Sequence, residues 1–280
     1  MAYDPTRYKQ DSMDNWNQRA RDYHDGWAGA GRGPFSSTRE LVNAAGVSEN
    51  DSVLDVACGT GAVSKEASLH LGPSGILVGI DFARGALKVA KENVQGGHFL
   101  EMDAENIGLH AKFDKILCQY ALMFFPEPAR VLEALRRLLK DDGVIAVAVH
   151  GTPQGVPYFS TIMEPVLKHI PDIRPQGAPT VHRFGNSKDL ENALDRAGFA
   201  EVAVMKYVFD YEVGNFSEYW SDYMSTTAAA IRSKIEVRGP RVVAEIKKEA
   251  EEKARCFIVK DGKLKFPWEV LVATGTAKSQ

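Results

Sequence analysis

One acidic residue and two glycines stand where a small ligand can be held. Asp55, Gly59 and Gly61 lie in the stretch 53–61, in which a short apolar run gives way to a glycine turn. Because glycine has no Cβ, the main chain can bend sharply here and let a ligand lie against it. The apolar spacing of residues 62–71 predicts a helix whose free N–H groups point back at the turn. A carboxylate at Asp55 repels phosphate and attracts an ammonium or hydroxyl group, so the stretch favours a zwitterionic, phosphate-free cofactor.

The stretch from Asp55 to Gly61 resembles motif I of the class I S-adenosylmethionine (SAM) methyltransferases. Later segments resemble the family's further motifs in order. They are Val78–Asp81, which ends 20 residues after Gly61, Met102–Ala104, Phe113–Cys118 and Leu138–Ile145. Within the family, the chain is most similar to the small-molecule branch that contains the ubiquinone/menaquinone-biosynthesis type C-methyltransferases. The resemblance covers residues 50–150 approximately, and it implies SAM as cofactor and S-adenosylhomocysteine as product.

A dinucleotide-binding turn of the NAD type is the alternative explanation for the same glycines. That fingerprint needs a third glycine three residues after Gly61, where this chain has Ser64. A pyrophosphate would also be repelled by Asp55. Asp81 could bind a ribose in either type of site, so it does not distinguish a SAM site from an NAD site. The sequence therefore favours SAM.

The resemblance gives the remaining strand-end residues tasks in cofactor binding. Asp81 can accept both ribose hydroxyls, and Phe82 offers an apolar face to adenine. Asp103 can accept the exocyclic amino group of adenine while Ala104 leaves room for the ring, although aspartate there is also suited to cap a helix. The other predicted cofactor-binding residues are Tyr23, Asp55, Ala57, Gly59, Gly61 and Gln119, with the Tyr23 hydroxyl directed at the methionine carboxylate.

A methyl acceptor that must lose a proton needs a base near the donating edge of the sheet. His24, His150 and His182 are the candidates, and His150 ranks first because it ends the fifth predicted strand. Tyr120 is its predicted catalytic partner, although a lone histidine is more often structural. The segment 118–128 brings apolar side chains to the same edge, where they either wall an acceptor pocket or pack the next helix.

Strands and helices alternate through the centre of the chain, which predicts right-handed crossovers and a parallel sheet. The expected strands cover residues 52–57, 75–81, 97–101, 113–118, 143–149, 202–209 and 267–275, and the expected helices between them cover 62–71, 84–94, 127–139 and 187–197. The fold class is thus α/β, with a Rossmann-like seven-stranded, mostly parallel sheet whose last strand is antiparallel. Helices on both faces and helical cap insertions complete it. Asp141–Gly143 indicates a turn before the fifth strand.

Four segments make up the predicted domain organisation. They are an N-terminal helical cap (1–46), the SAM-binding core (47–150), a lid insertion (151–186) and the remainder of the core (187–280), which holds a helical insertion at 211–263. Residues 1–12 are polar and predicted to be mobile, and an aromatic-bearing helix is expected over 11–27. Ser36, Ser37 or Thr38 is expected to cap a second helix that ends at Gly46.

The amino-acid composition limits the classes of molecule that this protein is expected to bind. The 280 residues are 44% hydrophobic with a net charge of −3, so no electrostatic footprint for nucleic acid is present. The absence of an N-P-P-Y tetrad also counts against DNA N-methylation. Cys58, Cys118 and Cys256 are far apart, which predicts neither a disulfide framework nor a metal site and fits a reducing compartment. No apolar leader or membrane-length stretch occurs, so we expect a cytoplasmic protein without stable membrane insertion.

These observations favour a SAM-dependent methyltransferase. The predicted partner is a small, apolar or aromatic acceptor such as a quinone precursor, a lipid or a secondary metabolite. The alternative is a SAM-binding sensor or scaffold that transfers no methyl group.

Overall fold

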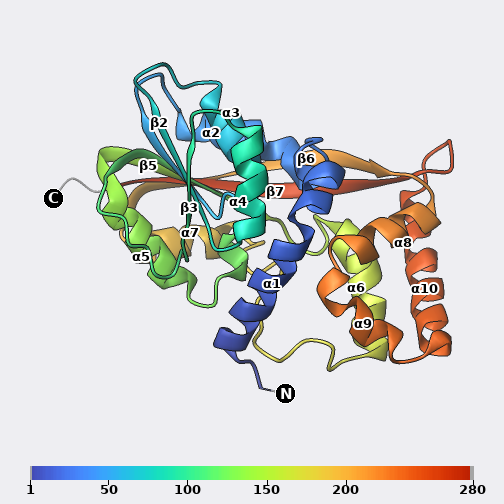
Figure 1. Ribbon diagram of the computed structural model, residues 1–280. Helices are drawn as coiled ribbons and strands as arrows, with labels where there is room; N and C mark the ends of the chain where they lie inside the picture. Colours follow the sequence, from blue (N-terminus) through green and yellow to red (C-terminus); the bar gives the residue numbers. More distant parts are fainter. Residues whose placement is uncertain (1, 278–280) are drawn as a thin grey trace. The chain divides into compact units, whose positions relative to one another are not determined.

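A computed structural model describes residues 2–277 and contains one seven-stranded sheet (Figure 1). The strands are β1 (Ser52–Val56), β2 (Ile76–Asp81), β3 (His98–Glu101), β4 (Phe113–Gln119), β5 (Leu139–His150), β6 (Phe199–Val213) and β7 (Leu264–Ala277). Their order is β3-β2-β1-β4-β5-β7-β6. The first five strands pair in parallel, whereas β7 is antiparallel to β5 and β6. The predicted fold class is confirmed.

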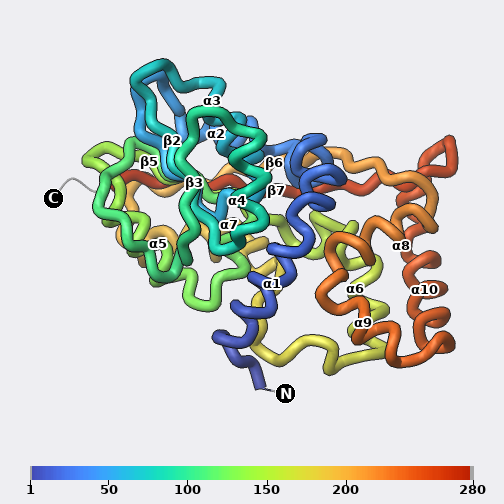
Figure 2. The backbone as a smooth tube through the Cα atoms, in the orientation of Figure 1, coloured from blue at the N-terminus to red at the C-terminus, as the bar shows by residue number. Residues whose placement is uncertain are grey.

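Helices connect the strands along the chain, which Figure 2 traces as a tube. They are α1 (Pro5–Tyr23), α2 (Thr38–Ala45), α3 (Ala62–Ser68), α4 (Arg84–Asn93), α5 (Pro128–Leu138), α6 (Pro157–His169), α7 (Ser187–Arg196), α8 (Phe216–Ser225), α9 (Ala229–Glu236) and α10 (Pro240–Ala254). A π-helical turn (His24–Ala28) follows α1, and a 3₁₀ turn (Gly33–Ser37) precedes α2. Gly46, with φ 64°, ends α2 as predicted.

Successive side chains of a strand point to opposite faces of the sheet, and this alternation positions the site. Leu54 and Val56 are fully buried in the apolar cluster that includes the inner faces of α5 and α7. Asp55 between them points to the other face, where the Ser64 hydroxyl of α3 donates to its Oδ2 at 2.6 Å. The same buried strand thus supplies core packing on one face and a carboxylate on the other.

The chain divides into two compact units, and each is described by itself. The core unit holds residues 6–151, 179–207 and 270–277, and the helical unit holds 2–5, 152–178 and 208–269. In the helical unit, Tyr158 is fully buried and its ring lies 5.1 Å from that of Trp268. Its hydroxyl donates to Asp222 Oδ2 at 2.7 Å. An aromatic core with its polar tip satisfied therefore stabilises this unit.

Two local predictions are wrong. Residues 5–12 belong to a helix and not to a mobile start, because α1 begins at Pro5 and its polar first turns make ion pairs such as Arg7 with Asp11. Asp141–Gly143 is not a turn ahead of the fifth strand but an irregular part of β5. The β4–β5 register shifts there, and Asp142 has φ 61°. The extra residues bulge out of the ladder, as an insertion into paired strands must.

Candidate active site

The glycine turn joins β1 to α3 and is tied to β2. Gly59 and Gly61 have φ values of 54° and 86°, which favour glycine, and the Gly59 N–H donates to Asp81 Oδ2 at 2.9 Å. A Cβ at Gly59 would meet no atom within 4 Å. At Gly61 it would lie 3.2 Å from side-chain carbons of Ala90 in α4 and of Val94, which follows α4. Gly59 therefore leaves the main chain open to a ligand, while Gly61 allows close packing of two helices.

Replacing Gly61 with alanine is expected to lower the free energy of unfolding by about 1–3 kcal/mol, since the new methyl group meets α4 and the backbone is strained. Gly96→Ala is the matched control, because Gly96 also has positive φ but open space around its Cβ position. Urea unfolding of both variants measures the difference. Equal losses in the two variants would contradict a packing role for Gly61.

Two buried carboxylates lie beside this turn. Asp55 and Asp81 are 1% and 7% exposed. Burial raises the pKa of Asp55 to about 7, and hydrogen bonds from Ser64 oppose the shift. Burial likewise raises the pKa of Asp81 to about 6, against donation from the N–H groups of Ala83 and Gly59. Such carboxylates gain from a ligand that brings an ammonium group and hydroxyls, so the residues present fit the amino-acid end and the ribose of SAM.

Asp103 lies just after β3 in a loop. Its Oδ1 accepts from the Glu105 N–H at 3.0 Å, and its Oδ2 accepts from Asn106 Nδ2 and Lys9 Nζ, both at 2.7 Å. No helix follows at this point of the described chain, so the helix-capping alternative for Asp103 is wrong. The adjoining Ala104 is buried in the cluster beneath α5.

The aromatic residues predicted for the cofactor site pack onto α1. Phe82 contacts the small buried cluster that contains Ala20 and is flanked by Trp16. The Tyr23 ring lies 4.9 Å from that of Trp16, edge to face, and burial raises the pKa of Tyr23. Ala57, between Asp55 and the glycines, has φ 53°. The end of α1 thus meets the loops after β1 and β2.

Gln119 is the last residue of β4, and its side chain is hydrogen-bonded to the start of α2. Its Oε1 accepts from Thr38 Oγ1 at 3.1 Å, and its Nε2 donates to Ser37 Oγ at 3.2 Å. Ser37 occupies the N-cap position of α2, but its side chain makes no capping bond. The predicted side-chain cap is therefore wrong, because the Ser37 hydroxyl is used by Gln119, Tyr120 and the Pro34 carbonyl instead.

Tyr120 and His150 form the end of the site beyond β4 and β5. Their rings stack with centroids 4.3 Å apart, and Tyr120 has φ 53°. The Tyr120 hydroxyl donates to the Pro34 carbonyl at 2.8 Å and lies 2.7 Å from Ser37 Oγ. Burial raises the pKa of Tyr120, and it lowers the pKa of His150 well below its usual value, with a further contribution from His182. His150 is thus a neutral imidazole at pH 7.

Sequence reasoning missed Phe35. Its ring lies 5.7 Å from that of Tyr23 and 6.2 Å from that of Tyr120, so Tyr23, Phe35, Tyr120 and His150 form a continuous aromatic row. Phe35 follows the glycine-rich stretch 29–34, and its neighbours in sequence carry no periodic signal. Only the tertiary fold reveals its place.

The structure separates the other two candidate histidines. His24 lies against the glycine turn, where its Nδ1 is 3.0 Å from Thr60 Oγ1 and its Nε2 is 3.1 Å from Asn93 Nδ2. His182 donates from Nδ1 to the Gly151 carbonyl at 2.7 Å, next to His150. His24 therefore belongs to the β1 end of the site and His182 to the β5 end.

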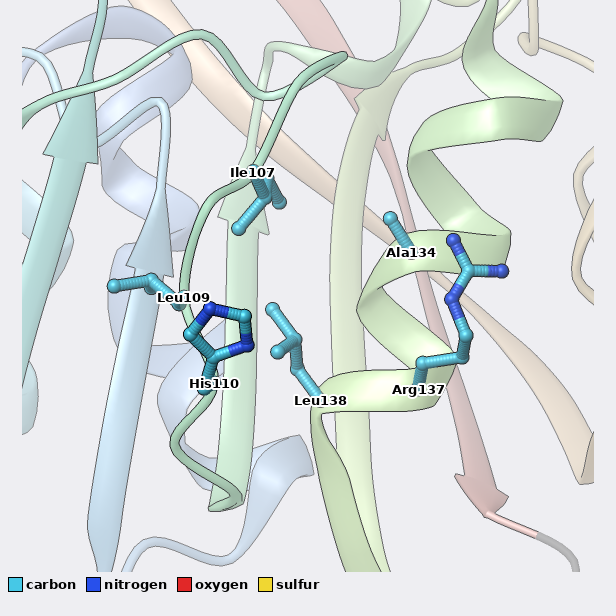
Figure 3. Close-up of a pocket in the computed structure, with 6 residues that line it drawn as sticks. All are labelled: Ile107, Leu109, His110, Ala134, Arg137 and Leu138. Carbon is cyan, nitrogen blue, oxygen red and sulfur yellow. The ribbon is translucent and has the colours of Figure 1, made fainter.

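A cavity of about 230 Å³ lies elsewhere, between the loop after β3 and α5 (Figure 3). Its lining consists of Ile107, Leu109, His110, Ala134, Arg137 and Leu138. None of these is a predicted site residue, so the strand-end carboxylates and this cavity are separate features. Within residues 2–277, no group of three or more metal-ligating side chains is placed to hold an ion. No helix over the same residues is long and apolar enough to cross a membrane.

A mostly parallel sheet with a glycine turn after β1 and buried carboxylates within β1 and at the end of β2 is the arrangement of Rossmann-like nucleoside-binding enzymes. The family described as "Methyltransferase domain" matches residues 47–184. Aklanonic acid methyltransferase DauC of Streptomyces sp. (strain C5) is 32% identical over 181 residues, which cover 59% of this chain and 81% of that protein. Demethylmenaquinone methyltransferase of Lactococcus lactis subsp. lactis is 28% identical over 173 residues, covering 56% and 68%.

A solved structure shows the same fold with cofactor bound. Haemonchus contortus phosphoethanolamine N-methyltransferase 2 in complex with SAM matches with a TM-score of 0.52 and 14% identity, covering 87% of this chain and 53% of that one. The chain therefore belongs to the class I SAM-dependent methyltransferases. Its cofactor is SAM and its product S-adenosylhomocysteine, so the sensor alternative is set aside.

Proposed function

We propose that this methyltransferase acts on a small acceptor with an apolar or aromatic body, such as a quinone precursor, a lipid or a secondary metabolite. The aromatic row carries the proposal. Tyr120 and His150 stand at the carboxyl ends of β4 and β5, next to the strand whose turn holds the cofactor. Stacked rings offer an apolar acceptor both contact area and a defined orientation. The names of the relatives, which refer to aklanonic acid and demethylmenaquinone, support the same class.

The predicted cofactor-binding residues are proposed to bind different parts of the cofactor at the ends of different strands. Asp55 faces the ammonium group, with the main chain of Ala57, Gly59 and Gly61 alongside, and Tyr23 and Gln119 lie near the methionine end. Asp81 takes the ribose. Phe82, Asp103 and Ala104 serve the adenine. SAM supplies an activated methyl group on a neutral leaving group, so the chain's residues mainly align the acceptor and exclude water.

His150 and Tyr120 are proposed as the residues that act on the acceptor. A neutral imidazole can accept a proton from an acceptor hydroxyl or enol. Tyr120 is a positioning residue here, because its hydroxyl is bound to Pro34 and Ser37 while its ring fixes the plane of His150.

Incubation with [methyl-³H]SAM tests the proposal. The acceptors supplied are aklanonic acid, a short-chain demethylmenaquinol and, as polar counterparts, glycine and phosphoethanolamine. We expect label in the solvent-extractable product of one of the first two. The acceptor class would be contradicted by transfer to the polar acceptors alone. It would also be contradicted if protein that binds S-adenosylhomocysteine transferred no label to either apolar compound or to a lipid extract.

His150→Ala is expected to lower turnover by about 10²-fold or more with the labelled acceptor, because proton acceptance and ring stacking are both lost. S-adenosylhomocysteine affinity should stay within about twofold, since no cofactor residue is changed. His110→Ala, an exposed histidine beside the separate cavity, is the matched control. Wild-type turnover in His150→Ala would remove His150 from the mechanism.

A further inference from the structure

The helix α1 and the residue that follows it contact the segments after three neighbouring strands of the core unit. Its neighbour His24 meets Thr60 after β1, Asn17 Oδ1 accepts from the Gly85 N–H after β2, and Lys9 reaches Asp103 after β3. Figures 1 and 2 show α1 running beside α4. Of these contacts, only that of Lys9 is made to a proposed cofactor carboxylate.

The contact made by Lys9 is an ion pair, whereas the other two are hydrogen bonds. Lys9 Nζ lies 2.7 Å from Asp103 Oδ2 and also pairs with the Glu105 carboxylate. Asp103 Oδ2 accepts from Asn106 as well, so both lone pairs of this oxygen are used. The Asp103 side chain keeps 30% exposure, whereas that of Glu105 keeps only 7%.

Glu105 gives Lys9 a second anchor. The Glu105 Oε1 accepts from the Glu127 N–H at 2.6 Å, which fixes the carboxylate. Lys9 can therefore release Asp103 and remain paired with Glu105. The ammonium stays neutralised in this exchange, which keeps its cost low.

We propose that Lys9 and the exocyclic amino group of the cofactor's adenine compete for the Asp103 carboxylate, so that Lys9 sets cofactor affinity and adenine selectivity. This inference rests on the proposed function, in which Asp103 receives that amino group. An ammonium is a stronger donor to a carboxylate than a neutral amine is, so the competition weakens binding. A cofactor base without the amino group has nothing to gain from the exchange.

Calorimetry with two ligands tests the competition. Lys9→Met keeps the length of the side chain but removes its charge, and we expect it to bind S-adenosylhomocysteine about 3- to 10-fold more tightly than the wild type. S-inosylhomocysteine, which has oxygen in place of the amino group, should show no such gain. Arg21→Met is the control, because Arg21 joins α1 to α4 through an exposed pair with Glu92. It should change neither affinity.

Each other outcome overturns the competition. Unchanged or weaker binding of S-adenosylhomocysteine by Lys9→Met means that Lys9 does not compete. An equal gain with the inosine analogue, or the same gain in Arg21→Met, means that α1 was merely loosened. If the folded wild type binds no S-adenosylhomocysteine at all, the assignment of the cofactor site fails first, which is a separate result.

Discussion

Replacing Asp81 with asparagine is expected to weaken S-adenosylhomocysteine binding by about 100-fold while the protein stays folded. The carboxylate already accepts from the Gly59 and Ala83 N–H groups, and it would accept the ribose hydroxyls in addition. Charge-assisted hydrogen bonds of this kind contribute about 1.5–3 kcal/mol each, and 100-fold corresponds to about 2.7 kcal/mol. An asparagine also turns an NH₂ group toward one of the two N–H donors, which disturbs the glycine turn.

Isothermal calorimetry measures this effect, and thermal unfolding verifies the fold. Asp114→Asn is the matched control, since Asp114 also accepts from a backbone N–H, that of Ser52, but at the opposite end of the sheet. Its ion pair with Lys140 holds the pKa of Asp114 down to about 2, although burial acts against this shift. That variant should lose stability but keep its affinity. Unchanged binding in Asp81→Asn would remove the ribose assignment.

The sequence could predict those parts of the site whose residues lie close together along the chain. Asp55, Gly59 and Gly61 lie within seven residues, and the turn needs their particular types wherever the rest of the chain goes. Asp81 follows at the end of the next strand, so parallel pairing alone brings it to the same edge. The resemblance that implied the family and the cofactor begins at these residues.

The remaining features depend on contacts between residues remote in sequence. Lys9 is one polar residue in a polar stretch, and only the fold reveals that it faces Asp103. The place of Phe35 in the aromatic row is likewise visible only in the fold, because Tyr23 and Tyr120 are remote from it in sequence. Ser37 was expected to cap α2, but Gln119 and Tyr120 compete for its hydroxyl from another strand. At Ser37, tertiary hydrogen bonds replace the local capping preference.

Asp55→Asn is expected to stabilise the protein at pH 8 and to weaken cofactor binding at the same time. Burial raises the pKa of Asp55 to about 7, far above that of an exposed aspartate, against hydrogen bonds from Ser64. The folded protein therefore binds more protons than the unfolded chain between about pH 4 and 7. The contribution of Asp55 to stability falls as the pH rises through this window, because the buried carboxylate must then carry its charge. Asp81, with a pKa of about 6, adds to the fall with the same sign.

Urea unfolding at pH 5 and pH 8 measures the consequence. The free energy of unfolding of Asp55→Asn relative to that of the wild type should rise between these two pH values and be about 1–3 kcal/mol higher at pH 8. Asp114, whose pKa is lowered, acts mainly below pH 4. His150, whose pKa burial lowers, makes stability rise with pH below about 6.5, but it is present in both proteins and cancels in the difference between them. A variant that is less stable than the wild type at pH 8 would contradict the buried charge as the cause.

Cofactor binding should respond in the opposite direction. An ammonium group beside Asp55 favours its ionised form, so binding near pH 6.5 should release protons, and the observed heat should vary with the ionisation enthalpy of the buffer. Asp55→Asn removes the charge that the ligand neutralises, and we expect S-adenosylhomocysteine to bind it at least about tenfold more weakly with a smaller proton release. Gain of stability together with loss of affinity identifies Asp55 as a residue whose buried charge is retained for the ligand. Equal affinity in the variant would place the ammonium group elsewhere.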